Sequence, residues 1–215
     1  MIPAQKRTRS QKDTAIVLLS GGQDSATCLA IAKEKHQHVI GLVIDYGQRH
    51  QVEISCAKRL AQKADIKICH IDTAFLKTLN PNALTENTIE IKEKSNDLPN
   101  TFVPGRNALF LTVAAMLAYQ HNSKIIYTGV CQTDYSGYPD CREEFIESIS
   151  KSLTLAMESH FMIKTPLMHL TKAETVLLMK SLGRLEWYAD THTCYEGLRP
   201  ACGKCPACKL RLNGY

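Results

Sequence analysis

The chain has 215 residues, of which 44% are hydrophobic and 22% are charged, and its formal net charge is +5. This length can bury one sizeable core, so we expect one domain with an appendage. No stretch reaches the roughly 18 consecutive apolar residues of a membrane span, and the basic N-terminus lacks the apolar segment of a secretory signal. We therefore expect a cytoplasmic protein with no membrane partner.

The distribution of charge and the number of cysteines restrict the class of protein and its partners further. Residues 1–12 hold four basic residues and no acid, and we expect residues 1–13 to form a disordered basic leader. The remaining chain has a net charge of +1, which argues against an obligatory nucleic-acid partner. Nine cysteines in a cytosolic chain indicate metal binding or buried thiols rather than disulfides.

Apolar runs alternate with helix-period segments along most of the chain. The runs span residues 14–19, 39–44, 66–71 and 124–130, and the helical segments span residues 25–34, 48–63, 106–121 and 142–159. Such continuous runs are typical of fully buried parallel strands. The alternation predicts an α/β fold, a doubly wound and mainly parallel sheet over residues 14–185, with ligands beyond the carboxyl ends of the strands.

The hexad Ser20-Gly21-Gly22-Gln23-Asp24-Ser25 lies between the first apolar run and the first helical segment. Glycines let a backbone approach a ligand closely, and a helix start offers free N–H groups to phosphate oxygens. The hexad lacks both the lysine of the Walker loop and the glycine spacing of dinucleotide enzymes. It resembles the signature of the PP-loop ATP pyrophosphatase superfamily. That resemblance implies cleavage of ATP between its α- and β-phosphates and adenylation of a carboxyl or carbonyl oxygen.

Four cysteines gather near the end of the chain: Cys194, Cys202, Cys205 and Cys208. Four thiolates from two short segments can close a tetrahedron around Zn²⁺, which would staple a C-terminal region over residues 186–215. A [4Fe–4S] cluster is an alternative that the spacing does not exclude. His192 is a spare candidate ligand, which we interpret as an ordinary loop histidine.

Two polar segments add candidates for substrate binding. Residues 102–107 place Arg106 at a helix start, where its guanidinium can bind a phosphate or carboxylate through two parallel hydrogen bonds. Residues 129–142 combine acids, hydroxyls and two tyrosines after the fourth apolar run. Such a set can stack a planar heterocycle and bind its edges by hydrogen bonds.

Taken together, these motifs resemble the 7-cyano-7-deazaguanine synthase family, also called the QueC family, over residues 14–211. The resemblance rests on the hexad and the cysteine cluster, and on residues 45–50, 102–107, 134–142 and 164–167. It implies an ATP-dependent ligase of queuosine biosynthesis that converts 7-carboxy-7-deazaguanine and ammonia to the nitrile, through an adenylated carboxylate and an amide. It also implies Mg²⁺, one structural zinc ion and a homodimer. A glutaminase domain would need over a hundred further residues, so we expect free ammonia or a separate partner to supply the nitrogen, with free ammonium as the simpler choice.

Roles follow for individual residues. We expect backbone N–H groups of the hexad, with the Ser20 and Ser25 hydroxyls, to bind the phosphates, and Asp24 to hold Mg²⁺ or to shape the loop. The predicted nucleotide site comprises Leu19, Ser20, Gly21, Gly22, Gln23, Asp24, Ser25, Ala26, Thr27 and Asp45. The predicted catalytic residues are Asp24, Arg106 and Lys164, the last two neutralising substrate carboxylate or pyrophosphate charge. The predicted substrate site comprises Phe102, Gly105, Arg106, Asn107, Asp134, Tyr135, Asp140 and Arg142.

Two alternatives stay open from the sequence. A PP-loop ligase or thiolase that modifies tRNA shares the hexad and can carry zinc cysteines, but it should show a larger basic surface. A non-catalytic nucleic-acid-binding protein would use the cysteines as a zinc knuckle and would leave the intact hexad without a purpose.

Overall fold

The computed structural model describes residues 13–48, 52–79, 81–85, 89, 98–132 and 138–215. The predicted leader over residues 1–12 therefore lies outside the described residues, as do Asp134 and Tyr135. The centre of the fold is a five-stranded sheet in the order β3-β2-β1-β4-β5. Its strands are parallel throughout: β1 (Thr14–Leu18), β2 (His38–Asp45), β3 (Lys67–Asp72), β4 (Ile125–Tyr127) and β5 (Met162–Lys164).

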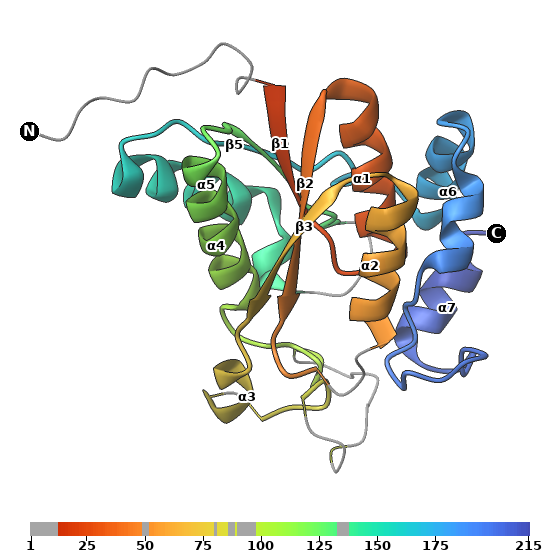
Figure 1. Cartoon of the computed structure of the whole chain (residues 1–215). Helices are drawn as coiled ribbons and strands as arrows, with labels where there is room; N and C mark the ends of the chain where they lie inside the picture. The colour runs from red at the N-terminus through yellow and green to blue at the C-terminus, as the bar shows by residue number, and fades with distance from the viewer. Residues whose placement is uncertain (1–12, 49–51, 80, 86–88, 90–97, 133–137) are drawn as a thin grey trace, which may run out of the picture.

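Helices cover both faces of this sheet (Figure 1). On one face lie α1 (Gln23–Lys35), α2 (Val52–Lys63) and α6 (Lys172–Ser181), and on the other lie α4 (Arg106–Gln120) and α5 (Glu143–Met157). The shorter elements are α3 (Phe75–Leu79), α7 (Pro206–Leu212) and the 3-10 helices η2 (Pro139–Cys141) and η3 (Leu185–Asp190). The doubly wound α/β prediction is thus confirmed. Within the described ranges, no helix has the length and apolar character needed to cross a bilayer.

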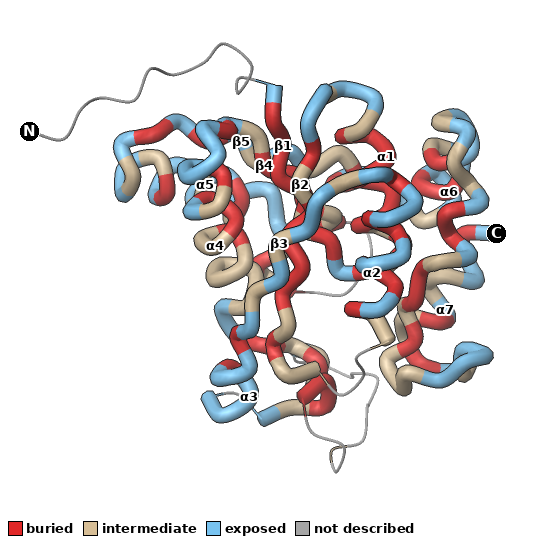
Figure 2. The backbone as a smooth tube through the Cα atoms, in the orientation of Figure 1, coloured by how far each residue is buried: buried red, intermediate tan, exposed pale blue. Residues whose placement is uncertain are grey.

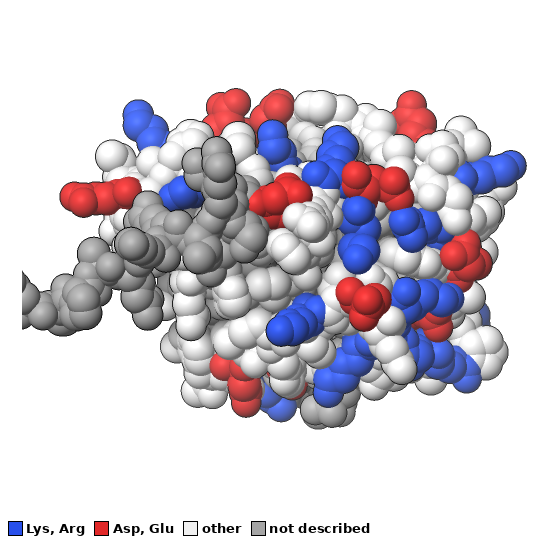
Figure 3. All heavy atoms as spheres, turned by 45° about the horizontal axis from the view of Figure 1, so that its top comes forward, with Lys and Arg blue, Asp and Glu red and all other residues white. Residues whose placement is uncertain are grey.

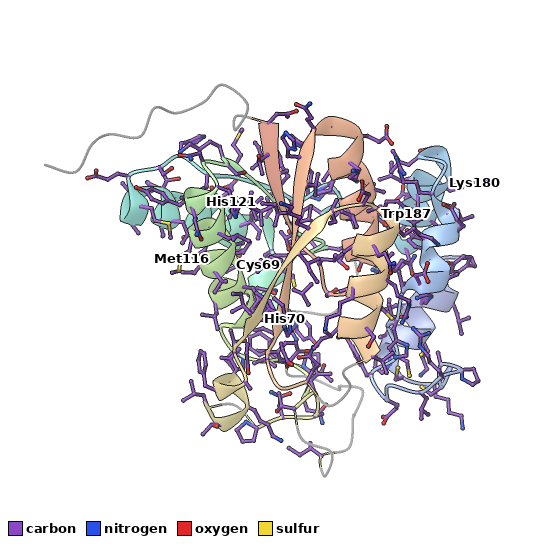
Figure 4. All side chains as sticks on the ribbon, viewed as in Figure 1. Cys69, His70, Met116, His121, Lys180 and Trp187 are labelled. Carbon is purple, nitrogen blue, oxygen red and sulfur yellow. The ribbon has the colours of Figure 1, made fainter. Side chains whose placement is uncertain are left out.

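Two apolar cores form because successive strand residues point to opposite faces. Ala15 and Val17 pack with α1, α2 and α6, whereas Ile16 packs with α4 and α5. Figure 2 shows the buried residues concentrated along the central strands and the inner faces of the helices. Trp187 of η3, labelled in Figure 4, joins the first core, and the Arg184 guanidinium stacks on its ring at 4.9 Å.

The structure departs from the predicted elements in three places. Strand β3 is not fully buried: it lies at the sheet edge, where helices cover only part of it, and Ile68 is 36% exposed. Helix α2 begins at Val52 rather than at residue 48, because the Gln48 side chain is used in a turn and accepts a hydrogen bond from the Tyr46 N–H at 3.0 Å. Strand β5 and helix α6 were not predicted.

Candidate active site

A cleft of ≈ 350 Å³ opens at the carboxyl ends of β1, β2 and β4. Strand β1 has β2 on one side and β4 on the other, so the chain changes winding direction here. Ligands of open α/β sheets bind at such a switch point. The walls come from segments far apart in the sequence, namely the hexad, the start of α2, the start of α4, residues 128–131, and residues 192–195 with part of α7.

The hexad forms the cradle of this cleft through hydrogen bonds within itself. The Ser20 hydroxyl donates to Ser25 Oγ at 3.1 Å, and the Ser25 hydroxyl donates to the Gly22 carbonyl at 3.0 Å. The Gly21 and Gly22 N–H groups donate to the two serine hydroxyls at 3.2 and 3.3 Å. Gly22 is the N-cap of α1, so the free N–H groups of the first helical turn and the positive helix end lie at the cleft. This arrangement suits an anion such as pyrophosphate.

Two glycines permit the close approach that the cradle needs. Gly21 has a φ of +88°, and a Cβ there would lie 2.1 Å from the Glu53 carbonyl oxygen in the first turn of α2. A Cβ at Gly129, just after β4, would lie 3.0 Å from Asp24 Cβ. The Gly21 carbonyl also accepts a hydrogen bond from the His192 N–H at 2.9 Å. The hexad is therefore held in place by close contacts with the start of α2, with Gly129 after β4 and with His192.

Asp24 forms an ion pair with Lys172 through both of its carboxylate oxygens. Lys172 Nζ, in the first turn of α6, donates to both Asp24 carboxylate oxygens at 2.8 and 2.7 Å. The lysine side chain is 13% exposed, and both residues line the cleft. A partly buried ammonium group beside the cradle can bind phosphate oxygens. Lys172 lies 148 residues from Asp24 in the sequence, so the fold brings the two together.

Arg106 lies opposite the hexad in an aromatic environment. Its guanidinium stacks over the Tyr46 ring at 5.4 Å and lies within electrostatic range of Tyr138 and Tyr195. Burial raises the pKa of Tyr46 to about 12 and raises the pKa of Tyr195, so these hydroxyls remain neutral at physiological pH. We call Arg106, Tyr46, Tyr138 and Tyr195 the arginine–tyrosine cage. It offers one cation for a carboxylate and three rings for stacking.

Apart from Gly21, the predicted nucleotide residues fall into three groups. Leu19, Ser20, Gly22, Gln23, Asp24 and Ser25 line the cleft. Ala26 and Thr27 are fully buried behind it, where the Thr27 hydroxyl lies 2.7 Å from that of Tyr188. Asp45 shapes the turn after β2, because its Oδ1 accepts a hydrogen bond from the Gly47 N–H at 3.0 Å.

The predicted substrate residues are only partly brought together. Arg106 and Asn107 line the cleft, whereas Gly105 is the N-cap of α4 and the Phe102 ring stacks on Tyr138 at 5.5 Å. Asp140 supports Asn107, because its Oδ2 accepts from the Asn107 N–H at 3.2 Å.

Two predicted cations lie outside the cleft walls. Arg142 is exposed at the start of α5, 3.7 Å from Glu144. Lys164 ends β5 and lines a different hollow, with His36 and Tyr127. The structure thus places Lys172, and not Lys164, beside the hexad.

The four C-terminal cysteines meet as the sequence predicts. Their sulfur atoms all lie within 4.8 Å of one another, and Cys202 Sγ lies 3.8 Å from Cys208 Sγ. A tetrahedral site with Zn–S bonds of ~2.3 Å requires sulfur separations of about 3.8 Å. The N–H groups of Cys205 and Lys204 donate to Cys202 Sγ, and these contacts lower the pKa of that thiol to about 6. The cluster can therefore hold a metal ion, and His192 lies outside it.

Several cleft residues were missed by the sequence reasoning. Tyr195 directly follows Cys194 of the cysteine cluster, so the position of the cluster also places Tyr195 in the arginine–tyrosine cage. Lys172 stands in the first turn of a helix that begins with a capping box, Thr171 with Glu174. That capping box was the available signal for α6.

The parallel sheet, its switch point and the Ser-Gly-Gly-x-Asp-Ser cradle define a nucleotide-binding α/β protein of the PP-loop class. Two solved structures share this fold. The NMN synthetase of Francisella tularensis matches with a TM-score of 0.53 at 20% identity, over 88% of this chain and 69% of that one. A 4-thiouridine synthetase in complex with RNA and ATP matches with a TM-score of 0.54 at 18% identity, over 94% of this chain and 50% of that one.

The family model described as queuosine biosynthesis protein QueC matches residues 14–215, and the chain belongs to this family. It is 51% identical over 207 residues to a 7-cyano-7-deazaguanine synthase of Bacillus subtilis, covering 95% of this chain and 94% of that protein. It is 50% identical over 205 residues to the 7-cyano-7-deazaguanine synthase of Staphylococcus haemolyticus, covering 94% of this chain and 92% of that protein.

Proposed function

We propose that this chain is an ATP-dependent carbon–nitrogen ligase that makes 7-cyano-7-deazaguanine from 7-carboxy-7-deazaguanine, ammonia and ATP. The observation that carries the proposal is the match to 7-cyano-7-deazaguanine synthases at about half identity over nearly the whole chain. The 4-thiouridine synthetase, which stands for the tRNA-modifying alternative, shares the fold at only 18% identity. The zinc-knuckle alternative leaves the hexad without a purpose.

The cleft has the two halves that this reaction needs. The hexad and Lys172 would bind the phosphates, and the arginine–tyrosine cage would bind the substrate, with Arg106 on its carboxylate and the tyrosine rings against its planar ring. Both halves lie in one cleft of ≈ 350 Å³, which is within the usual size of small-molecule sites. The reacting carboxylate would therefore meet the α-phosphate between them.

The chemistry asks for orientation and charge stabilisation rather than a protein nucleophile. A carboxylate oxygen attacks the α-phosphorus, pyrophosphate leaves, and ammonia then displaces AMP to give the amide. The amide oxygen attacks a second ATP, and loss of AMP leaves the nitrile. Lys172 and the N-terminal end of α1 would neutralise the negative charge of the departing pyrophosphate.

Two metal ions belong to the proposal. Mg²⁺ would enter on the ATP phosphates, where it supplies charge neutralisation, and Asp24 is the carboxylate of the cradle that would hold it. Exchange of Lys172 from Asp24 to a phosphate would free both oxygens for this role. One Zn²⁺ per chain would be held by the four cysteines, where it closes the C-terminal region.

We extend the proposal to the assembly and the compartment. The family resemblance implies a homodimer. Met116 (Figure 4) and Tyr119 are both exposed on α4 and offer apolar surface for it. None of the nine cysteines forms a disulfide, which supports a reducing compartment such as the cytoplasm. Acidic and basic side chains are interspersed over the face drawn in Figure 3, so that face does not form a continuous basic surface.

The deciding experiment is product analysis. Purified protein is incubated with 7-carboxy-7-deazaguanine, ammonium and Mg-ATP, and the base, AMP and pyrophosphate are followed by mass spectrometry. We expect the nitrile, with two AMP formed per nitrile. The amide alone would restrict the activity to the first activation, and no conversion of the base would favour the tRNA-modifying relatives.

A further inference from the structure

Glu53 is a carboxyl group of the cleft that the proposed steps leave without a role. It lies in the first turn of α2 and lines the cleft between the hexad and the arginine–tyrosine cage. Its carbonyl oxygen occupies the space beside Gly21, so the helix turn that carries Glu53 is pressed against the phosphate cradle. Its position is therefore fixed relative to the site where the carboxylate would be activated.

The surroundings of Glu53 combine low polarity with one cation. Among the described residues, Arg106 of α4 and Tyr46 after β2 interact electrostatically with the Glu53 carboxyl group. Burial raises the pKa of Glu53 to about 7, against the opposing charge of Arg106. A carboxyl group with such a pKa can both accept and release a proton near neutral pH, which is the property of an efficient general base.

We infer that Glu53 is the catalytic proton acceptor for the reacting nitrogen, an inference that rests on the proposed function. In the first half, the Glu53 carboxylate takes a proton from ammonium, and the freed lone pair attacks the acyl carbon. The carbon–nitrogen bond forms with three protons still on the nitrogen. Glu53, which has passed its first proton to the solvent, takes one of these, and the bond from carbon to the AMP oxygen breaks with its electron pair on AMP, which leaves the neutral amide. The proton passes from Glu53 to the solvent in the open cleft before the next transfer.

The second half needs the same base. Once the amide oxygen carries AMP, the nitrogen must lose both of its remaining protons. The first transfer to Glu53 gives the neutral imidate. The second transfer lets the N–H electron pair form the new π bond while AMP leaves with the C–O pair. Protons, electrons and atoms balance without any further reactant.

The other candidate bases of the cleft are less suitable within the described chain. Asp24 accepts hydrogen bonds from Lys172 in this structure and would hold Mg²⁺ once ATP is bound, so its oxygens are occupied in both cases. His192 Nε2 lies 3.2 Å from the Cys194 carbonyl oxygen, a contact in which the imidazole nitrogen is the donor. Burial raises the pKa of Cys141 and of Tyr46 to about 12, so neither is ionised near neutral pH. Of the two carboxyl groups among the described residues that line the cleft, Asp24 and Glu53, Glu53 is therefore the one left to take a proton.

The test compares Glu53→Gln, which keeps the shape but cannot take a proton, with Glu147→Gln on the exposed face of α5 as a matched control. Two rates are measured across neutral pH with the full protein: nitrile formation with ammonium, and carboxylate-dependent ATP–pyrophosphate exchange without ammonium. We expect Glu53→Gln to lower kcat for the nitrile by about 10²- to 10⁴-fold. We also expect it to lose the rise in rate through about pH 7. Exchange should stay near the wild-type rate.

Hydroxylamine provides a rescue arm, because it is a neutral nucleophile near neutral pH. Glu53→Gln should form the hydroxamate at close to the wild-type rate. A raised KM with unchanged kcat would overturn the inference and assign Glu53 to recognition of the ring, and loss of exchange together with the nitrile would assign it to activation. If the wild-type protein forms the nitrile and Glu53→Gln forms it at the same rate, this inference is wrong and the proposed function still holds. A wild-type protein that converts no base defeats the proposed function as well.

Discussion

At Gly21 the backbone has a φ of +88°, and a Cβ would lie 2.1 Å from the Glu53 carbonyl oxygen. At Gly183 the φ is +67°, but a Cβ would meet no atom within 4 Å. Gly183→Ala should therefore cost about 1 kcal/mol of stability through backbone strain alone. Gly21→Ala adds the displacement of α2 and should cost about 3 kcal/mol or more.

Urea unfolding of the two alanine variants measures the difference, and nucleotide binding is measured alongside. Only Gly21→Ala should lose nucleotide binding, since Gly183 lies after α6 and outside the cleft walls. Equal stability losses at the two positions would show that α2 adjusts freely to the hexad.

The raised pKa of Glu53 also predicts how stability depends on pH. The folded protein binds this proton more tightly than the unfolded chain, whose glutamate pKa is about 4.3. The stabilising contribution is therefore full below about pH 4.3 and is lost as the pH rises to about 7. Glu53→Gln removes this loss, so its thermal midpoint relative to wild type should be higher at about pH 8 than at about pH 5. A difference that does not change with pH would show that Glu53 is ionised at both values.

The place of the hexad in the cleft was predictable because its spacing between a strand and a helix is local, whereas its binding of phosphate stays a prediction. Lys172 and Tyr195 were not, since each reaches the cleft from a segment more than a hundred residues away from the hexad in the sequence. Lys164 was chosen for its motif, but strand β5 directs it to another hollow. Pairing over such separations depends on tertiary packing, which a single sequence does not encode in its local pattern.

At the scale of elements, the long apolar runs predicted β1 and β2 well because both are buried from two sides. Strand β5 has only three residues with an exposed–intermediate–exposed pattern, so it gave no periodic signal. Strand β3 was expected to be buried, but a run of apolar residues does not say whether a strand lies at an edge. The elements were therefore predictable where burial was complete.

Removal of the metal tests how the C-terminal elements support the cleft. Cys194 leads into Tyr195, and the His192 N–H binds the Gly21 carbonyl, so loss of the metal should loosen this whole wall. We expect chelation of the holo protein to lower the thermal midpoint by about 5 °C or more, and to weaken nucleotide binding. Elemental analysis should give one zinc per chain.

Cys205→Ser should reproduce the effect of chelation, whereas Cys69→Ser on β3 serves as the control outside the cluster. Iron in the purified protein would contradict the zinc assignment. Unchanged nucleotide binding after chelation would show that the wall holds its place without the metal.

At the scale of the whole molecule, the cleft joins parts of the chain that lie far apart in the sequence. The hexad near the beginning and residues 192–195 near the end meet at Gly21, and α6 adds Lys172 from the same layer of helices (Figure 1). A ligand that bridges these parts should stabilise the entire fold, because it binds only the folded arrangement.

This coupling predicts a stability gain with α,β-methylene-ATP, which carries the phosphates but cannot be cleaved between its α- and β-phosphorus atoms. At a concentration of about 100 times Kd, the gain should be about 2.7 kcal/mol, or a rise in thermal midpoint of about 5–10 °C for a chain of this size. Lys172→Ala should lose most of this rise, because a hydrogen bond to a charged group contributes about 1.5–3 kcal/mol. Lys164→Ala, in the separate hollow, should keep it. A rise lost in Lys164→Ala and kept in Lys172→Ala would place the phosphates away from the hexad.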